Sequence, residues 1–139
     1  MTVTIYHNPD CGTSRNVLAV IKAAGYQPIV IEYLKAGWEK DQLLKLFSEA
    51  GLTPRMALRE TKSPAKDLGL LEPGVSDERI LEAMLSVPVL VNRPLVVTAK
   101  GTKLCRPSET ILDLLDKWPT GPFMKEDGTV MIDANGNRA

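Results

Sequence analysis

The residue whose type and position best suit chemistry is Cys11. It lies between a predicted strand and a predicted helix, in the run His7-Asn8-Pro9-Asp10-Cys11-Gly12-Thr13-Ser14-Arg15. At the N-terminus of a helix the free backbone N–H groups and the dipole stabilise an anion, so a thiol there has a pKa below its ordinary value of about 8.5. The thiolate is the nucleophilic form. We therefore expect Cys11 to be a reactive nucleophile, although an average cysteine is more often a small buried hydrophobic residue.

The neighbours of Cys11 suggest how a thiolate and a bound anion would be held. Gly12 lets a ligand approach the backbone, and the N–H groups of Gly12, Thr13 and Ser14 are placed to bind an oxyanion. His7 lies upstream, where an imidazolium near the sulfur would favour the thiolate, but a capping or surface role is an equal alternative. Ser14 stands where a Cys-x-x-Cys motif has its second cysteine, so it cannot resolve a disulfide. Its hydroxyl is expected to donate to the sulfur, unless Ser14 is only a residue of the first helical turn.

Three arginines are candidate anion ligands, because the planar guanidinium binds oxyanions bidentately. Arg59 ends a short predicted helix, while Arg93 and Arg106 each precede a proline and so come from extended or turn segments. Spacing alone equally allows solvated surface charges. A phosphatase-type loop is excluded, since it needs an arginine six residues after the cysteine, where this chain has Val17.

Composition and charge exclude several classes of protein. The chain has 139 residues with 17 Lys+Arg, 17 Asp+Glu and 44% hydrophobic residues, which is ordinary globular composition. A nucleic-acid binder shows a basic excess, and a disordered chain shows low hydrophobicity with a large net charge. No apolar run approaches the roughly 20 residues of a membrane span, and the start of the chain has no export-signal pattern. We expect a cytoplasmic protein that binds neither nucleic acid nor membrane.

The remaining cysteine and the histidine content limit metal and disulfide chemistry. Cys11 and Cys105 are far apart in a chain expected to stay in a reducing compartment, so both are expected to be reduced thiols. Cys105 lies at the end of an apolar predicted strand and is interpreted as a structural residue. His7 is the sole histidine, so no His-rich metal site is expected.

The elements that must position these residues follow from hydrophobic periodicity and turn signals. Residues 2–6 and 28–33 are predicted strands, and the helix between them implies a βαβ unit with parallel strands. Two predicted helices follow, one closed by Gly51 and one starting at Ser76-Asp77, with short helices or turns over 52–70. The chain then gives predicted strands at 95–98 and 102–105 and a helix capped by Ser108.

The order βαβ, helical insertion, ββα predicts an α/β protein. It is the order of a thioredoxin-like fold with a mixed β-sheet and an inserted helical segment between its two halves. We expect one domain over 1–118 that includes the insertion at about 37–90. Residues 119–139 are expected to be an irregular tail or small hairpin packed on the same domain.

The sequence closely resembles the glutaredoxin-coupled, glutathione-dependent arsenate reductases of bacteria. The likeness covers nearly the whole chain, and the cysteine loop combined with all three arginines is more specific than the loop alone. The matching segments are residues 5–9, Cys11-Gly12-Thr13-Ser14-Arg15-Asn16, Ala57-Leu58-Arg59, Asn92-Arg93-Pro94 with Val96-Val97-Thr98, Leu104-Cys105-Arg106-Pro107-Ser108-Glu109 and Lys125-Glu126-Asp127-Gly128.

The resemblance implies the reduction of arsenate to arsenite by a Cys11 thiolate that forms a covalent cysteine–arsenic intermediate. It implies glutathione as co-substrate, no tightly bound cofactor, glutaredoxin as protein partner and phosphate as a competitor of arsenate. A monomer is expected.

The resemblance also implies a role for each site residue. Arg59, Arg93 and Arg106 would hold the oxyanion and later arsenic intermediates. His7 would lower the pKa of the thiol, and Ser14 would hydrogen-bond the sulfur. Two further features bear on the site: Pro94 matches the cis-proline of the thioredoxin fold, and Asp10 is a departure that disfavours the thiolate if its carboxylate points inward.

Two other functions fit the cysteine loop. One is a redox-sensing regulator of the same fold that binds a protein partner, against which the three arginines argue. The other is a glutathione-linked oxidoreductase with another substrate.

Overall fold

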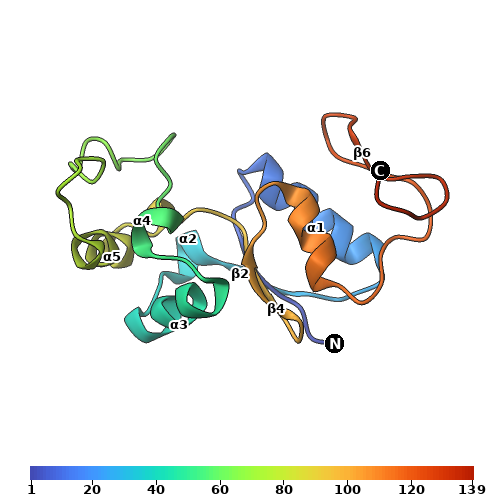
Figure 1. The fold of residues 1–139 in the computed structure, drawn as a ribbon, viewed down its shortest axis with the longest axis horizontal. Helices are drawn as coiled ribbons and strands as arrows, with labels where there is room; N and C mark the ends of the chain where they lie inside the picture. Colours follow the sequence, from blue (N-terminus) through green and yellow to red (C-terminus); the bar gives the residue numbers. More distant parts are fainter. The chain divides into compact units, whose positions relative to one another are not determined.

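Residues 1–139 are described by a computed structural model and divide into two compact units. The first unit is formed by Met1–Glu32 together with Arg93–Ala139, and the second is Tyr33–Asn92. Figure 1 draws both units as a ribbon and labels some of their helices and strands. The expectation of a single domain with an insertion stays a prediction.

The first unit is built on a four-stranded sheet in the order β2-β1-β3-β4. β1 pairs in parallel with β2 and antiparallel with β3, and β3 pairs antiparallel with β4. This mixed sheet of a βαβ half and a β-hairpin half confirms the predicted fold class. The strands are β1 Thr4–His7, β2 Ile29–Glu32, β3 Leu95–Thr98 and β4 Gly101–Leu104. β4 begins one residue earlier than predicted, because Gly101 already pairs with Thr98 across a turn of two residues.

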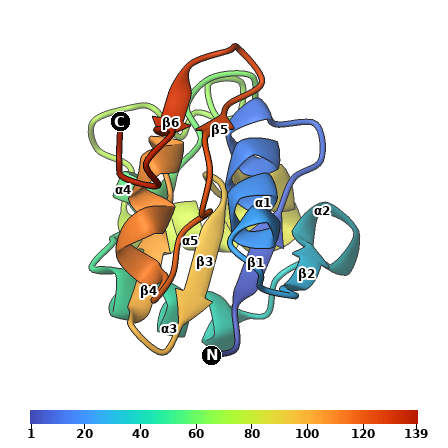
Figure 2. The same ribbon diagram turned by 90° about the vertical axis from the view of Figure 1, so that its right-hand side faces the viewer.

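Two helices, α1 (Gly12–Ala23) and η2 (Ser108–Leu114), lie side by side over one face of this sheet (Figure 2). The prediction of a helix in this segment is confirmed, but the prediction that Ser108 caps it is wrong. η2 is a 3-10 helix, in which the Thr110 N–H donates to the Pro107 carbonyl three residues back. Ser108 is the first helical residue, and its Oγ donates to the neighbouring Glu109 carboxylate instead of accepting from the backbone.

The core of the first unit joins the sheet, both helices and the tail. The tail forms a small hairpin of β5 (Phe123–Met124) and β6 (Val130–Ile132), and its Met131 and Ile132 belong to the core. Burying one such side chain contributes about 1.5–3 kcal/mol, so this apolar contact fixes the hairpin to the unit. The core residues are Val3, Ile5, Val17, Val20, Ile21, Ala24, Val96, Cys105, Ile111, Leu112, Leu114, Leu115, Met131 and Ile132.

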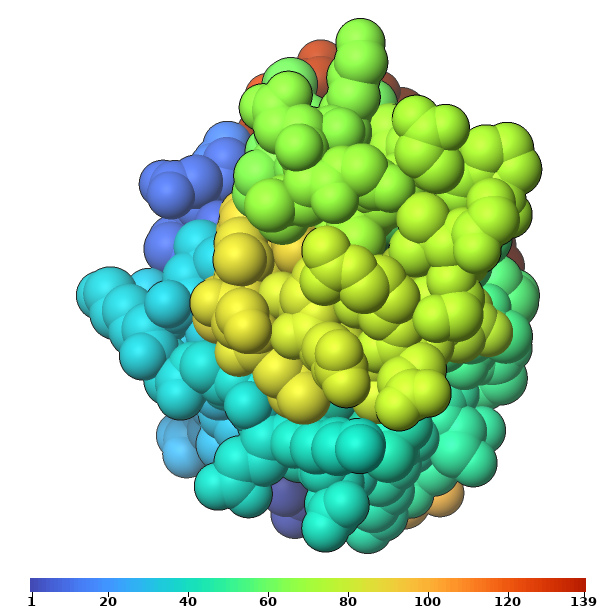
Figure 3. All heavy atoms as spheres, turned by 90° about the vertical axis from the view of Figure 1, so that its left-hand side faces the viewer, coloured from blue at the N-terminus to red at the C-terminus, as the bar shows by residue number.

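The second unit is helical, as predicted, and one face of its surface is seen in Figure 3. Its longer helices have the caps that their sequences indicate. Gly51 ends α3 in the left-handed conformation at φ 69°, and Ser76 Oγ accepts the Arg79 N–H at the start of α5. The elements are α2 Tyr33–Ala36, α3 Lys40–Ala50, α4 Pro54–Ala57, α5 Asp77–Ser86 and η1 Pro88–Leu90. None of the helices in either unit has the length and apolar character needed to cross a membrane.

Candidate active site

Cys11 lies in the loop that leads from β1 into α1 and is the N-cap residue of that helix. Its backbone is extended, and its carbonyl accepts the Arg15 N–H at 2.9 Å as the helix begins. The loop is turned by Asn8, whose Oδ1 accepts the Asp10 N–H at 2.9 Å and whose carbonyl accepts the Cys11 N–H at 3.1 Å. The thiol is thus at a helix N-terminus, while Asp10 is exposed to solvent, where water screens its charge.

The surroundings of Cys11 favour its thiolate. Burial raises the pKa of the thiol, but the backbone N–H of Ser14, the charge of Arg93, a hydrogen bond from Arg106 and the backbone N–H of Thr13 all lower it. The lowering contributions exceed the effect of burial, and the pKa lies below its ordinary value. The thiolate is therefore held by two backbone donors of α1 and two guanidinium groups.

Arg106 reaches the sulfur from the segment that follows β4. Its Nη1 lies 3.7 Å from Cys11 Sγ and donates to the Arg93 carbonyl at 3.1 Å. The peptide bond from Arg93 to Pro94 is cis, as the resemblance implied, and so is the bond from Arg106 to Pro107. The sheet thus brings both predicted arginines of the first unit to the cysteine loop.

His7 and Ser14 form a buried pair beside the loop. His7 Nδ1 lies 2.6 Å from Ser14 Oγ, which also accepts the Asn8 N–H at 3.1 Å. Which atom donates in the His7–Ser14 contact depends on the tautomer of the imidazole. The Ser14 hydroxyl thus contacts His7 and Asn8 while the Ser14 backbone N–H lowers the pKa of Cys11, and a hydrogen bond from the hydroxyl to sulfur stays a prediction.

The surroundings of His7 favour its neutral form. Burial lowers its pKa below 6.5, with the charges of Lys22 and Arg15 adding to this effect and that of Glu32 opposing it. The role of His7 in lowering the pKa of the Cys11 thiol stays a prediction, and a lowered pKa of His7 does not favour it. His7 contacts the side chain of Ser14, whose backbone N–H lowers the pKa of Cys11.

Arg59 lies in the second unit, two residues after α4. Its backbone N–H donates to the Leu90 carbonyl at 2.8 Å, and its Nε donates to the Thr61 carbonyl at 3.1 Å. These contacts fix its backbone and the base of its guanidinium. Its part in anion binding stays a prediction.

Cys105 is a buried core residue of the first unit. Its exposed fraction is 0%, and burial raises its pKa to about 12. Neither cysteine is in a disulfide. The structural interpretation of Cys105 agrees with this environment, in which a thiolate is strongly disfavoured.

Sequence reasoning gave no role to Arg15 and Glu126, although both border the cysteine loop. Arg15 Nε donates to both carboxylate oxygens of Glu126, at 3.1 and 2.9 Å. Opposite charges 111 positions apart carry no sequence signal of contact. The resemblance in the segment 125–128 was the only indication that this part of the tail matters.

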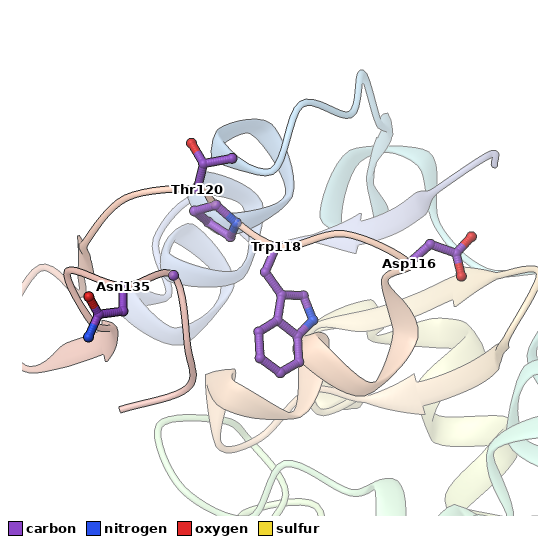
Figure 4. A pocket seen from close by; sticks show the side chains of 6 residues that line it. Asp116, Trp118, Thr120 and Asn135 are labelled. Atoms are coloured by element: carbon purple, nitrogen blue, oxygen red, sulfur yellow. The ribbon is translucent and has the colours of Figure 1, made fainter.

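No three His, Cys, Asp or Glu side chains gather where they would hold a metal ion. An open pocket in the first unit is lined by Trp118 and its neighbours (Figure 4), and it contains none of the predicted site residues. Its lining is Asp116, Trp118, Pro119, Thr120, Asn135 and Gly136.

Comparisons with a family profile and with individual proteins point to the same family. A family profile described as the ArsC family matches residues 6–114. The chain is 67% identical over 136 residues to a protein of Synechocystis sp. named arsenate reductase ArsI2, covering 98% of this chain and 97% of that protein. It is 48% identical over 136 residues to the arsenate reductase of Escherichia coli, covering 98% and 96%.

A solved structure extends the likeness to the fold. The arsenate reductase from Vibrio cholerae superposes with a TM-score of 0.77 at 36% identity, covering 83% of this chain and 98% of that one. Matches of this extent in profile, sequence and fold leave one conclusion: the chain belongs to the ArsC family.

Proposed function

We propose that this protein reduces arsenate to arsenite, with Cys11 as nucleophile, glutathione as co-substrate and glutaredoxin as protein partner. The observation that carries the proposal is a thiol of lowered pKa with the Arg106 guanidinium 3.7 Å from its sulfur. A cation beside a thiolate is what a nucleophile needs to approach an oxyanion. The names of the relatives in Synechocystis and Escherichia coli supply the identity of that oxyanion.

In the first step the Cys11 thiolate attacks the arsenic(V) atom. A sulfur–arsenic bond forms, an arsenic–oxygen bond breaks, and that oxygen leaves as water with protons taken from the bound arsenate and solvent. Arg93 and Arg106 offset the negative charge of arsenate and of the transition state. The backbone N–H groups of Gly12 and Thr13 are further candidate donors to an arsenate oxygen.

In the later steps two thiols outside this chain supply the electrons. Ser14 cannot resolve the adduct, so a glutathione thiol displaces a second oxygen as water and forms a sulfur–arsenic bond. A glutaredoxin thiolate then attacks the glutathione sulfur, giving a mixed disulfide. The electron pair of the glutathione–arsenic bond stays on arsenic, which becomes arsenic(III). Water then releases arsenite from Cys11.

Arg59 is proposed as a third ligand of the oxyanion, as the family resemblance implies. Phosphate has the same shape and charge as arsenate, and it is proposed to compete without being reduced.

The deciding experiment measures NADPH consumption with arsenate, glutathione, glutaredoxin and glutathione reductase. We expect turnover by the purified protein, none by Cys11→Ser, and a higher KM for arsenate when phosphate is added. Arg93→Ala and Arg106→Ala should lower kcat/KM for arsenate while circular dichroism stays unchanged. Absence of turnover by the unaltered protein would favour the redox-sensing regulator, and full turnover by Cys11→Ser would overturn the mechanism.

A monomeric state and a cytoplasmic location are also proposed from the sequence. Light scattering at several protein concentrations tests the first, and cell fractionation tests the second. A mass of 15.2 kDa in solution is the expected result.

A further inference from the structure

The β5–β6 hairpin carries a charged turn that contacts the start of α1. Glu126 lies in this turn and accepts two hydrogen bonds from Arg15 Nε, at 3.1 and 2.9 Å. Its backbone N–H donates to Asn16 Oδ1 at 3.0 Å. A charged contact and a backbone contact thus join the same residue of the tail to the helix that begins beside Cys11.

Arg15 extends this contact to the residues on both sides of the nucleophile. Its Nη1 donates to the Pro9 carbonyl at 2.8 Å, and its Nη2 lies 3.7 Å from the position of a Cβ built on Gly12. The guanidinium therefore covers the loop from before Cys11 to after it. The hydrogen bond and charge of Glu126, and then the charge of Cys11, raise the pKa of Arg15, so the cation interacts with both anions.

Lys125, the neighbour of Glu126, connects the same turn to η2. Its Nζ lies 3.0 and 3.2 Å from the carboxylate oxygens of Glu109, and Glu109 Oε1 accepts the Ser108 hydroxyl at 3.0 Å. This is the start of η2, two residues after Arg106. The two charged residues of the turn therefore hold the two chain segments that meet at the sulfur.

We propose that the Lys125–Glu126 turn braces the active site, and that Glu126 is a positioning residue that acts on Cys11 through Arg15. An exposed ion pair contributes little to stability, so its effect is expected in the geometry of the loop. With Glu126 present, the guanidinium is fixed over the loop and its charge stays near the thiolate. The tail has no part in the proposed function. This inference rests on the proposed function only in taking Cys11 as the nucleophile.

Alkylation of Cys11 by iodoacetamide as a function of pH tests the brace without arsenate. We expect Glu126→Gln to raise the apparent pKa of the thiol and to slow alkylation at pH 7 about threefold. Loss of a carboxylate by itself would lower that pKa, because a nearby negative charge disfavours the thiolate. A rise therefore reports loss of position, while a fall or no change would overturn the proposal.

A matched control uses the other exposed arginine–carboxylate contact of the tail. Arg138 Nη2 lies 2.9 Å from Asp113 Oδ1, and both side chains are about half exposed. Asp113→Asn is expected to leave both the alkylation profile and arsenate turnover unchanged. An equal effect of Asp113→Asn and Glu126→Gln would show a general consequence of loosening the tail and would contradict the brace.

A double-mutant cycle shows whether Glu126 acts through Arg15. We expect the double variant Arg15→Gln/Glu126→Gln to have the alkylation profile of Arg15→Gln alone, whereas independent effects would contradict the coupling. Arg15→Lys keeps the charge but loses the planar fork, and it should also raise the apparent pKa of Cys11. Glu126→Asp, which keeps the charge with a shorter reach, provides the same readout if Glu126→Gln does not fold. Turnover of arsenate should fall about threefold in kcat/KM wherever alkylation slows.

Discussion

At the scale of single residues, backbone N–H groups and guanidinium groups lower the pKa of Cys11, while burial lowers the pKa of His7. His7 is 6% exposed and hydrogen-bonded to a Ser14 hydroxyl that is itself buried. Protonating this imidazole would cost desolvation, which is the largest cause of its lowered pKa. The buried contact with Ser14 joins His7 to the residue whose backbone N–H lowers the pKa of Cys11.

The sole histidine makes this assignment measurable. We expect an NMR titration of the native protein to give His7 a pKa below 6.5, because burial disfavours the charged ring. The folded pKa is lowered, so the unfolded state binds the proton first. The free energy of unfolding should then fall as pH drops below 6.5 and level off below the folded pKa. A native pKa at or above 6.5, or an equal pH dependence in His7→Gln, would contradict this.

The two cysteines should differ sharply in reactivity. With its pKa raised to about 12, Cys105 is expected to resist iodoacetamide at pH 8 in the native protein and to react once it is unfolded. Peptide mass spectrometry after alkylation measures both sites at once, with Cys11 as the internal reference. We also expect Cys105→Ala to retain arsenate turnover. Loss of most of the turnover in a folded Cys105→Ala protein would show that the second thiol has a chemical role.

At the scale of elements, helices begin and end where a single residue provides a hydrogen-bond partner for backbone groups at the helix end. Gly51 ends α3 with its N–H donating to the Ser48 carbonyl and φ at 69°. A side chain at this position would be strained by its own backbone conformation alone, since no other group lies within 4 Å of a Cβ built on Gly51. The same signal in the sequence, a glycine after an apolar helical stripe, is why this helix end was predicted correctly.

Gly74 gives a matched comparison for that helix end. A Cβ built on Gly74 also meets nothing within 4 Å, but its φ lies outside the left-handed range. We expect Gly51→Ala to lower the free energy of unfolding by about 1 kcal/mol and Gly74→Ala to leave it unchanged or raise it slightly. Urea denaturation of both variants checks the difference. Equal effects would show that the backbone angle at Gly51 is not what matters.

At the scale of the whole molecule, a net charge of zero coexists with local excesses of charge. The first unit gathers Arg93 and Arg106 at a thiolate, and neutralises Arg15 with Glu126. Overall neutrality gives no long-range attraction for polyanions, but it does not limit the field in a small site. Selectivity for a small oxyanion is therefore a matter of where a few arginines are placed.

The proposed role of Arg59 is the prediction that concerns both units of the chain. We expect Arg59→Ala to raise the KM for arsenate about tenfold, which corresponds to the loss of about 1.4 kcal/mol from a charge-assisted contact. Arg79, an exposed arginine of the same unit at the start of α5, is the control, and Arg79→Ala should leave the KM unchanged. Steady-state kinetics with varied arsenate measure both. An unchanged KM in a folded Arg59→Ala protein would remove Arg59 from the site.

By itself, the sequence determined what depends on neighbours along the chain. Strand and helix periods, the glycine at the end of α3, the Ser76 cap and the cysteine before α1 are encoded within a few residues, because backbone angles and caps are local properties. Only the tertiary structure decided which distant groups meet. The approach of Arg106 to Cys11 and of Glu126 to Arg15 depends on sheet register and on packing of the tail. The contact of the Ser14 hydroxyl with His7 also depends on tertiary structure, because burial beside β1 restricts a side-chain rotamer that the sequence leaves free.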